Sequence, residues 1–347
     1  YVLIVHYISK VNPLVKLRKY EYLIVINLAA SFAMLGTFIY GGYFWASIVA
    51  STTALLASFV FCYFFVVDAR KIQDASKIWF LAGLFFAVIS SIGVFNLAYM
   101  MSSKNINQDL YLASEYYFLH FQYNGFFIFS CIGLLLYSMK EAGSPISAKK
   151  NKLLFWLMFF GCLIGVGLSF LWMKLPAVIF AVIVLGTLGQ TAGAIILYGF
   201  VKKSWTNLVL KWSPMHRFVL LFVGFAFALK IALQLGSNIP AVNQFAFGFR
   251  NVVIAYLHLV LLMCIATFLV NQILATNFFT NSKTLLLGLK LFLLGIFLNE
   301  LLLGLMGIFS IKYISIPYAN HFLLYISLLI FVALLIIFIN LKTKKQN

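Results

Sequence analysis

Charged residues are scarce in this sequence, and their scarcity excludes a soluble protein. Aspartate, glutamate, lysine and arginine together make up 9% of the 347 residues, whereas a soluble domain carries about 25%. Hydrophobic residues make up 64%, and the mean hydropathy is +1.05. Runs of about 20 apolar residues cross a bilayer as helices, because lipid offers backbone polar groups no partners. We therefore expect an all-α integral membrane protein.

Cysteine is also rare, and no familiar hydrolase motif occurs. Cys62, Cys131, Cys162 and Cys264 stand singly within apolar segments, without the CxxC spacing that binds zinc, an iron–sulfur cluster or covalent haem. We interpret them as packing residues. Serine-protease, P-loop and HExxH patterns are missing, so the sequence gives no support to a hydrolytic enzyme.

Long apolar runs fill most of the chain and predict a polytopic helix bundle, a single integral membrane domain over residues 1–347. The segment 1–8 is too short to span, and we interpret it as the end of a truncated helix. Ten complete spans are expected at residues 20–41, 43–66, 76–101, 113–138, 152–173, 175–201, 215–236, 249–275, 284–308 and 319–341.

Basic residues gather in alternate loops and give the expected orientation. Nineteen of the 25 lie in loops that we assign to the cytoplasm, which is the positive-inside pattern of membrane proteins. The net charge of +18 is thus a topology signal and does not indicate nucleic-acid binding. We expect a multi-pass protein of the bacterial inner membrane with a cytoplasmic C-terminus.

Polar side chains within the spans lie mostly at one depth, in the outer third of the predicted membrane. Such groups persist in hydrocarbon only where something pairs with them or uses them, so this layer is where a site is expected. Its members are Asn96, His120, Lys230, Gln234, His258, Asn299 and Glu300, whereas Gln190 lies outside it, in the inner half.

His120 and His258 are the candidate metal ligands of this layer. His120, Tyr123 and Asn124 are spaced i, i+3 and i+4, which places an imidazole, a phenol and an amide on one helix face. His258 has large apolar neighbours and only Tyr256 as a polar neighbour on its own helix, so its imidazole needs a partner elsewhere. A haem iron or another metal would satisfy that need, and so would a hydrogen bond to another helix.

Lys230 is the costliest residue of the layer, because a lysine inside a helix disfavours insertion unless it pairs or reaches the surface. Glu300 lies at a similar predicted depth and has the opposite charge, so we expect the two to pair, directly or through a ligand. The alternative is that Lys230 extends outward past Gln234, one turn above it.

The placement of the two histidines resembles subunit I of the haem–copper oxidases, a superfamily that includes nitric oxide reductases. If 1–8 is the tail of that family's second helix, His120 falls on helix six and His258 on helix ten, which carry metal and haem ligands in the family. The segment LHFQYNG at 119–125 is also similar to a helix of a group of Bacteroidetes membrane proteins.

The sequence departs from the family at three places. Residues 152–173 contain no histidine where the family has a pair, and Tyr256 stands where the family has the first histidine of His-x-His. The part of the family's second helix that supplies the other ligand of the low-spin haem is not in this sequence. A complete copper site is therefore not expected, and neither is oxygen reduction with proton pumping.

The resemblance implies haem b as the cofactor, with copper or non-haem iron in second place. It further implies electron transfer or the handling of a diatomic gas such as nitric oxide or oxygen, an oxidoreductase if the chain is an enzyme, and a cytochrome c or another redox subunit as partner. Two alternatives stay open. One is a small-molecule transporter that uses Lys230, Gln234, Asn299 and Glu300, and the other is a structural membrane subunit without a cofactor.

Overall fold

The computed structural model describes the chain except residues 43, 174, 244–248, 277–278, 280–281 and 342–347. Every extended regular element in the described part is a helix. Ten of these helices, some of them interrupted by other helical turns, are long and apolar enough to cross a membrane, and they coincide with the ten predicted spans. The expected multi-pass helical architecture is confirmed at that level.

The chain divides into two compact units, residues 1–140 and 141–347. Whether they form the single membrane domain expected from the sequence stays a prediction. The helices of the first unit are α1 (Val2–Val11), α2 (Arg18–Gly41), α3 (Trp45–Ala69), α4 (Lys77–Ser103), α5 (Gln108–His120), the π-helical segment η1 (Phe121–Phe127) and α6 (Ile128–Glu141).

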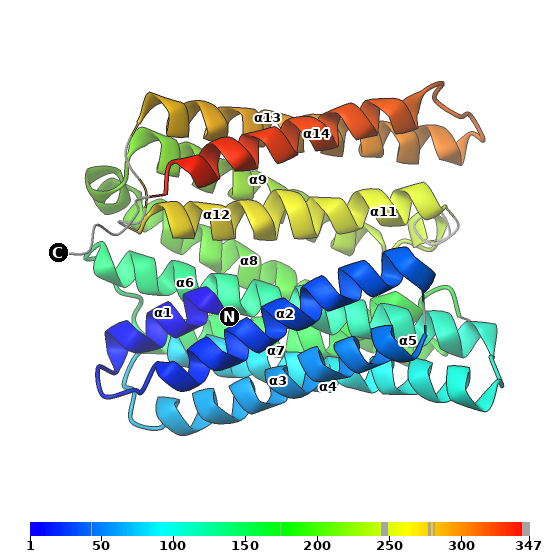
Figure 1. Ribbon diagram of the computed structural model, residues 1–347, viewed down its shortest axis with the longest axis horizontal. Coiled ribbons are helices and arrows are strands. Elements are labelled where there is room, and N and C mark those ends of the chain that lie inside the picture. The colour runs from blue at the N-terminus through cyan, green and yellow to red at the C-terminus, as the bar shows by residue number, and fades with distance from the viewer. Residues whose placement is uncertain (43, 174, 244–248, 277–278, 280–281, 342–347) are drawn as a thin grey trace. The chain divides into compact units, whose positions relative to one another are not determined.

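The second unit contains the remaining described helices, and within it α13 and α14 lie side by side (Figure 1). Its helices are α7 (Ala148–Gly165), the 3-10 turn η2 (Val166–Phe170), α8 (Ala177–Lys211), α9 (Pro214–Gly236), α11 (Arg250–His258), the π-helical segment η3 (Leu259–Ala266), α12 (Thr267–Leu274), α13 (Lys283–Ile311) and α14 (Ala319–Ile339).

Helix α8 extends well beyond the predicted end of its span at residue 201. Hydropathy falls there because lysines appear, but the backbone hydrogen bonds continue. Leu208 is fully buried, the Asn207 amide donates to the Ser144 hydroxyl at 2.7 Å, and the Lys211 ammonium donates to the Glu141 carbonyl. These contacts hold the extension after the apolar stretch has ended, so the predicted loop 202–214 is wrong for most of its length.

Large apolar side chains cover the helix surfaces as well as the interior. Phe32 on α2 is 66% exposed and Phe331 on α14 is 58% exposed. Soluble proteins rarely expose apolar surface on that scale. The apolar exterior therefore supports the association with a lipid bilayer that the composition predicted.

Aromatic packing joins α4 to η1 in the first unit. Phe86 stacks on Phe121 with ring centroids 5.5 Å apart, and both rings are buried. Gly125 makes this approach feasible, since a Cβ at that position would lie 2.4 Å from the Cβ of Phe86. The glycine thus holds the π-helical segment directly against α4.

In the second unit, small residues allow α7 and α8 to approach closely. A Cβ at Gly161 would lie 2.4 Å from the Gln190 Cγ and 2.9 Å from the carbonyl oxygen of Gly186. A Cβ at Gly193 would lie 2.8 Å from the Met158 sulfur. Gly161 and Gly193 are therefore contact residues between the two helices.

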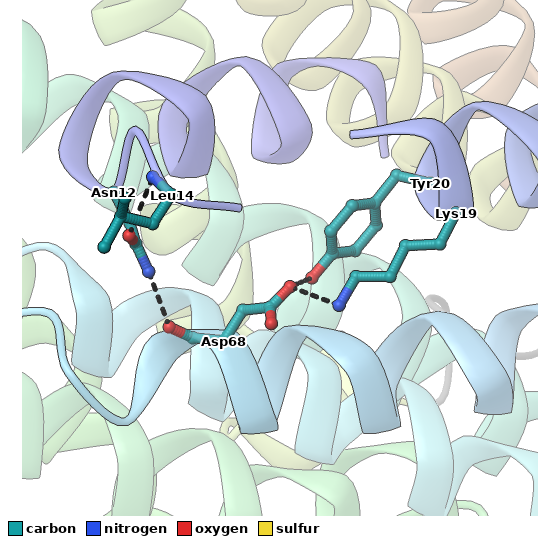
Figure 2. A network of polar contacts seen from close by, with 5 residues as sticks. All are labelled: Asn12, Leu14, Lys19, Tyr20 and Asp68. Carbon is teal, nitrogen blue, oxygen red and sulfur yellow. Dashed lines mark hydrogen bonds and ion pairs between the residues drawn. The ribbon is translucent and has the colours of Figure 1, made fainter. Parts of the chain in front are cut away.

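Asp68 organises one end of the first unit, as Figure 2 shows. Its carboxylate accepts a hydrogen bond from the Tyr20 hydroxyl at 2.8 Å and pairs with the Lys19 ammonium, also at 2.8 Å. Its backbone carbonyl accepts from the Asn12 amide at 3.2 Å, and Asn12 in turn accepts from the backbone N–H of Leu14. One residue at the end of α3 thereby fixes both the start of α2 and the turn after α1.

Asp74, in the loop between α3 and α4, fixes a second set of elements. It accepts from the Tyr7 hydroxyl at 3.0 Å, the Ser76 backbone N–H at 2.9 Å and the Lys140 ammonium at 2.7 Å. Burial favours a higher pKa for this carboxyl, but the hydrogen bonds from Lys140, Ser76 and Tyr7 outweigh burial, and the net pKa lies below its ordinary value. The ionised form of Asp74 therefore stabilises the fold.

Candidate functional site

Each candidate histidine is the last residue before a π-helical segment. His120 ends α5 and η1 begins at the next residue; His258 ends α11 and η3 begins at the next residue. π-helical turns are rare and occur frequently at functional sites, because the extra residue per turn shifts side chains out of the regular helical register. The sequence predicted an uninterrupted helix at both places. The structure corrects this, because each helix changes to π-helical hydrogen bonding directly after the histidine.

His120 lies in a compact polar group within the first unit. Its side chain is 2% exposed, and its Nδ1 lies 3.2 Å from the Asn124 Nδ2. The Tyr123 ring stands edge-on to the imidazole at 6.4 Å between centroids. The three side chains that the sequence predicted on one face are thus neighbours.

Asn124 carries an unsatisfied atom beside this imidazole. Its Oδ1 is buried and has no hydrogen-bond partner in the described part of the chain. Buried amide oxygens are normally bonded, and a side-chain amide can turn to exchange its oxygen and nitrogen. Turned in that way, Asn124 would accept a hydrogen bond from Nδ1–H of His120, and the His120 Nε2 would then carry the lone pair.

Hydrogen bonds to α4 hold the helix that carries His120. The Gln122 amide donates to the Ser90 hydroxyl at 2.8 Å. Asn96, another member of the predicted polar layer, donates to the Ser114 hydroxyl at 2.6 Å. Asn96 therefore serves as an inter-helix contact between α4 and α5.

His258 has a defined tautomer. Its Nδ1 lies 2.9 Å from the backbone carbonyl of Ile254, and because a carbonyl can only accept, Nδ1 carries the proton. In the neutral imidazole the lone pair is then on Nε2, for which the described residues provide no partner. The sequence predicted that the imidazole would need a partner outside its own helix. This is corrected for Nδ1, which bonds to the Ile254 carbonyl one turn earlier on the same helix. Tyr256 is half-buried on the same helix.

Lys230 is almost completely buried, at 1% exposed, and bonds to two glutamines in series. Its ammonium donates to the Gln234 Oε1 at 2.6 Å, and the Gln234 Nε2 donates to the Gln190 Oε1. The thiols of Cys162 and Cys264 lie close enough to interact electrostatically with the ammonium. The group joins α7, α8, α9 and η3, all within the second unit.

The direct pairing of Lys230 with Glu300 is not found among the described residues, whose ion pairs are Lys19–Asp68 and Lys140–Asp74. Glu300 instead accepts from the neighbouring Asn299 amide at 3.3 Å. Lys230 does reach toward Gln234, as the alternative interpretation required, but it does not reach the surface.

The residues of the predicted polar layer are divided between the two compact units. His120, Tyr123 and Asn124 belong to the first unit, whereas His258, Lys230, Gln234, Asn299 and Glu300 belong to the second. A site shared by His120 and His258 stays a prediction. Sequence reasoning placed Gln190 outside the layer and assigned Cys162 and Cys264 to packing, so it missed their association with Lys230. Within the described residues, no group of three or more His, Cys, Asp or Glu side chains is placed to hold a metal ion.

In comparison with known proteins, the chain matches no protein-family model and no curated protein. The resemblance to haem–copper oxidases therefore rests on the residues quoted from the sequence.

The hydrogen bond that His258 makes through Nδ1 is of the kind expected for an axial ligand of a haem. Histidines that bind iron or another metal usually donate their second ring N–H to a carbonyl or carboxylate, which fixes the tautomer and the ring orientation. The hydrogen bond from Nδ1 of His258 to the Ile254 carbonyl is of this kind. His120 requires the turn of the Asn124 amide before it reaches the same state, so His258 is the better-prepared ligand.

Proposed function

We propose that this chain is a membrane haem protein in which His258 is an axial ligand of a b-type haem or, as the second choice, the ligand of a single metal ion. The observation that supports this is the hydrogen bond from Nδ1–H of His258 to the Ile254 carbonyl, which leaves the lone pair of the neutral imidazole on Nε2. The π-helical segment that begins at the next residue is a second mark of a functional position.

A haem held by one histidine supplies a one-electron redox couple and an open position for a diatomic gas. The proposed role is accordingly electron transfer, or the handling of nitric oxide or oxygen, at the bacterial inner membrane with a cytoplasmic C-terminus. A cytochrome c or another redox subunit would exchange the electron. His258 would hold the iron, and the Ile254 carbonyl keeps the imidazole in the tautomer that leaves the Nε2 lone pair for it. Tyr256, on the same helix, would be a further cofactor-binding residue.

The test is the reduced-minus-oxidised spectrum of the full chain purified from a haem-sufficient host. We expect b-type bands that His258→Ala abolishes. His321→Ala is the matched control, because His321 is an exposed histidine at the start of α14, and it should leave the bands unchanged. A colourless preparation without bound iron or copper would refute the proposal, as would bands that survive in His258→Ala.

Small-molecule transport is a second candidate function, and the buried Lys230 favours it. Charged residues within membrane helices commonly mark substrate or ion pathways. The test is the current recorded from proteoliposomes when small solutes are exchanged rapidly at the membrane. Loss of that current in Lys230→Met, with the current retained in Lys290→Met, would support transport; Lys290 is an exposed lysine within α13. No current for any solute would remove this candidate.

A further inference from the structure

Lys230 is a buried cation without an acidic partner in the described structure. The chain has seven acidic side chains, and all of them lie in the described part. Two of them form the ion pairs already described for the first unit, and none pairs with Lys230. A buried charge is costly unless an opposite charge offsets the loss of hydration. A counter-charge that is not part of this chain would remove that cost.

The orientation of the two glutamines follows from Lys230. An ammonium can only donate, so the Gln234 side-chain oxygen must face it. The amide nitrogen of Gln234 then faces Gln190, and the Gln190 oxygen must turn toward that nitrogen. The direction of every hydrogen bond in the series is fixed by the cation at its start.

Donors are therefore in excess in this group. The ammonium keeps two N–H groups, the Gln234 amide keeps one and the Gln190 amide keeps both, with no acceptor among the described residues. The nearby thiols of Cys162 and Cys264 are weak donors and weak acceptors, so they do not change this balance. A set of donors around a positive charge attracts an anion and repels a metal ion.

The surroundings restrict the size of such an anion. Gly161 lies so close to Gln190 that a Cβ would sit 2.4 Å from the Gln190 Cγ and 2.9 Å from its backbone nitrogen. Cys162, the next residue along α7, is fully buried. Such close packing of α7 on α8 argues against a large organic acid and restricts the candidate ligand to a monatomic anion.

We propose that Lys230, Gln234 and Gln190 form a binding site for a small monovalent anion such as chloride. The ammonium provides the charge and the two amides provide directed N–H groups. This site uses none of the residues of the haem proposal. It supplies the ligand for the transport candidate, but it is a claim about binding, so loss of flux with binding intact would remove transport alone.

The first test is the thermal stability of the purified full chain when chloride replaces gluconate at constant ionic strength. A ligand of the folded state raises the unfolding temperature in a saturable way. We expect this rise in the native protein and in Lys290→Met, and no rise in Lys230→Met. An equal response to the two anions, or an equal response of native protein and Lys230→Met, would overturn the proposal.

A second variant covers the case in which Lys230→Met does not fold. Gln190→Leu keeps the cation but removes the terminal donors, and it should weaken the apparent chloride affinity by about tenfold, since a hydrogen bond to a charged group contributes about 1.5 kcal/mol or more. Unchanged affinity in Gln190→Leu would contradict the site.

Bromide locates the ion directly. In crystals grown in bromide, the anomalous signal should place an ion within about 3.5 Å of the Lys230 Nζ. An anomalous peak only at other positions, or none at all, would exclude this group as the binding site.

Discussion

Replacing Asp68 by alanine should lower the free energy of unfolding by about 2–3 kcal/mol, and the structure indicates how that sum arises. The larger part comes from Tyr20, which is fully buried and whose hydroxyl would lose its acceptor; a buried donor left unsatisfied costs about 1–3 kcal/mol. The smaller part comes from Lys19, whose side chain is 29% exposed; such a pair contributes about 0.2–1 kcal/mol.

This reasoning makes a sharper prediction for the double variant. Tyr20→Phe removes the orphaned donor, so Asp68→Ala combined with Tyr20→Phe should cost less than the sum of the single changes, with a coupling of about 1–2 kcal/mol. The assay is denaturant unfolding in mixed micelles. Glu21→Ala, which removes an exposed carboxylate one residue from Tyr20, is the control and should change little. Additive effects, or an Asp68→Ala variant no less stable than Glu21→Ala, would show that the hydroxyl is satisfied in another way.

Two further predictions follow from single residues. Because the Asp74 pKa is lowered in the folded protein, its stabilisation is fully present above the ordinary carboxyl pKa and is lost as the pH falls below about 4. Unfolding temperatures measured across that range should therefore fall more steeply for the native chain than for Asp74→Asn, and parallel curves would contradict this. Gly161→Ala should destabilise by about 1–3 kcal/mol, because its Cβ would overlap atoms of α8. Gly199→Ala on α8, where a Cβ meets nothing within 4 Å, should be neutral or slightly stabilising in the same unfolding assay.

The membrane spans were predictable because hydropathy alone decides them. All ten lie where apolar runs of sufficient length occur, since an unpaired backbone group in lipid enforces a helix regardless of the residue types. Helix α8 departs from the pattern because side-chain contacts hold it together after the apolar run has ended, and composition carries no record of such contacts.

The π-helical segments were not predictable from the same signal. The sequence around His120 mixes polar and apolar residues and that around His258 is strongly apolar, and both are compatible with an unbroken α-helix. An extra residue per turn changes the register of hydrogen bonds without changing the composition. The altered hydrogen-bond register goes together with tertiary contacts, such as that of Phe86 with Gly125, which composition does not record.

The predicted membrane depth of Lys230 gave its burial correctly but not its hydrogen-bond partners. Its position along α9 predicted a buried cation, and it is buried. The same reasoning chose Glu300 as its partner, because depth places two residues at one level but does not say which faces of their helices meet. The second glutamine of the series, Gln190, is 44 residues from Gln234 in the chain and was assigned to a different level. Its side chain packs against Gly161 of α7, where a Cβ would lie 2.4 Å from the Gln190 Cγ. The cation on α9 fixes the direction of both hydrogen bonds in the series, which leaves hydrogen-bond donors in excess around Lys230.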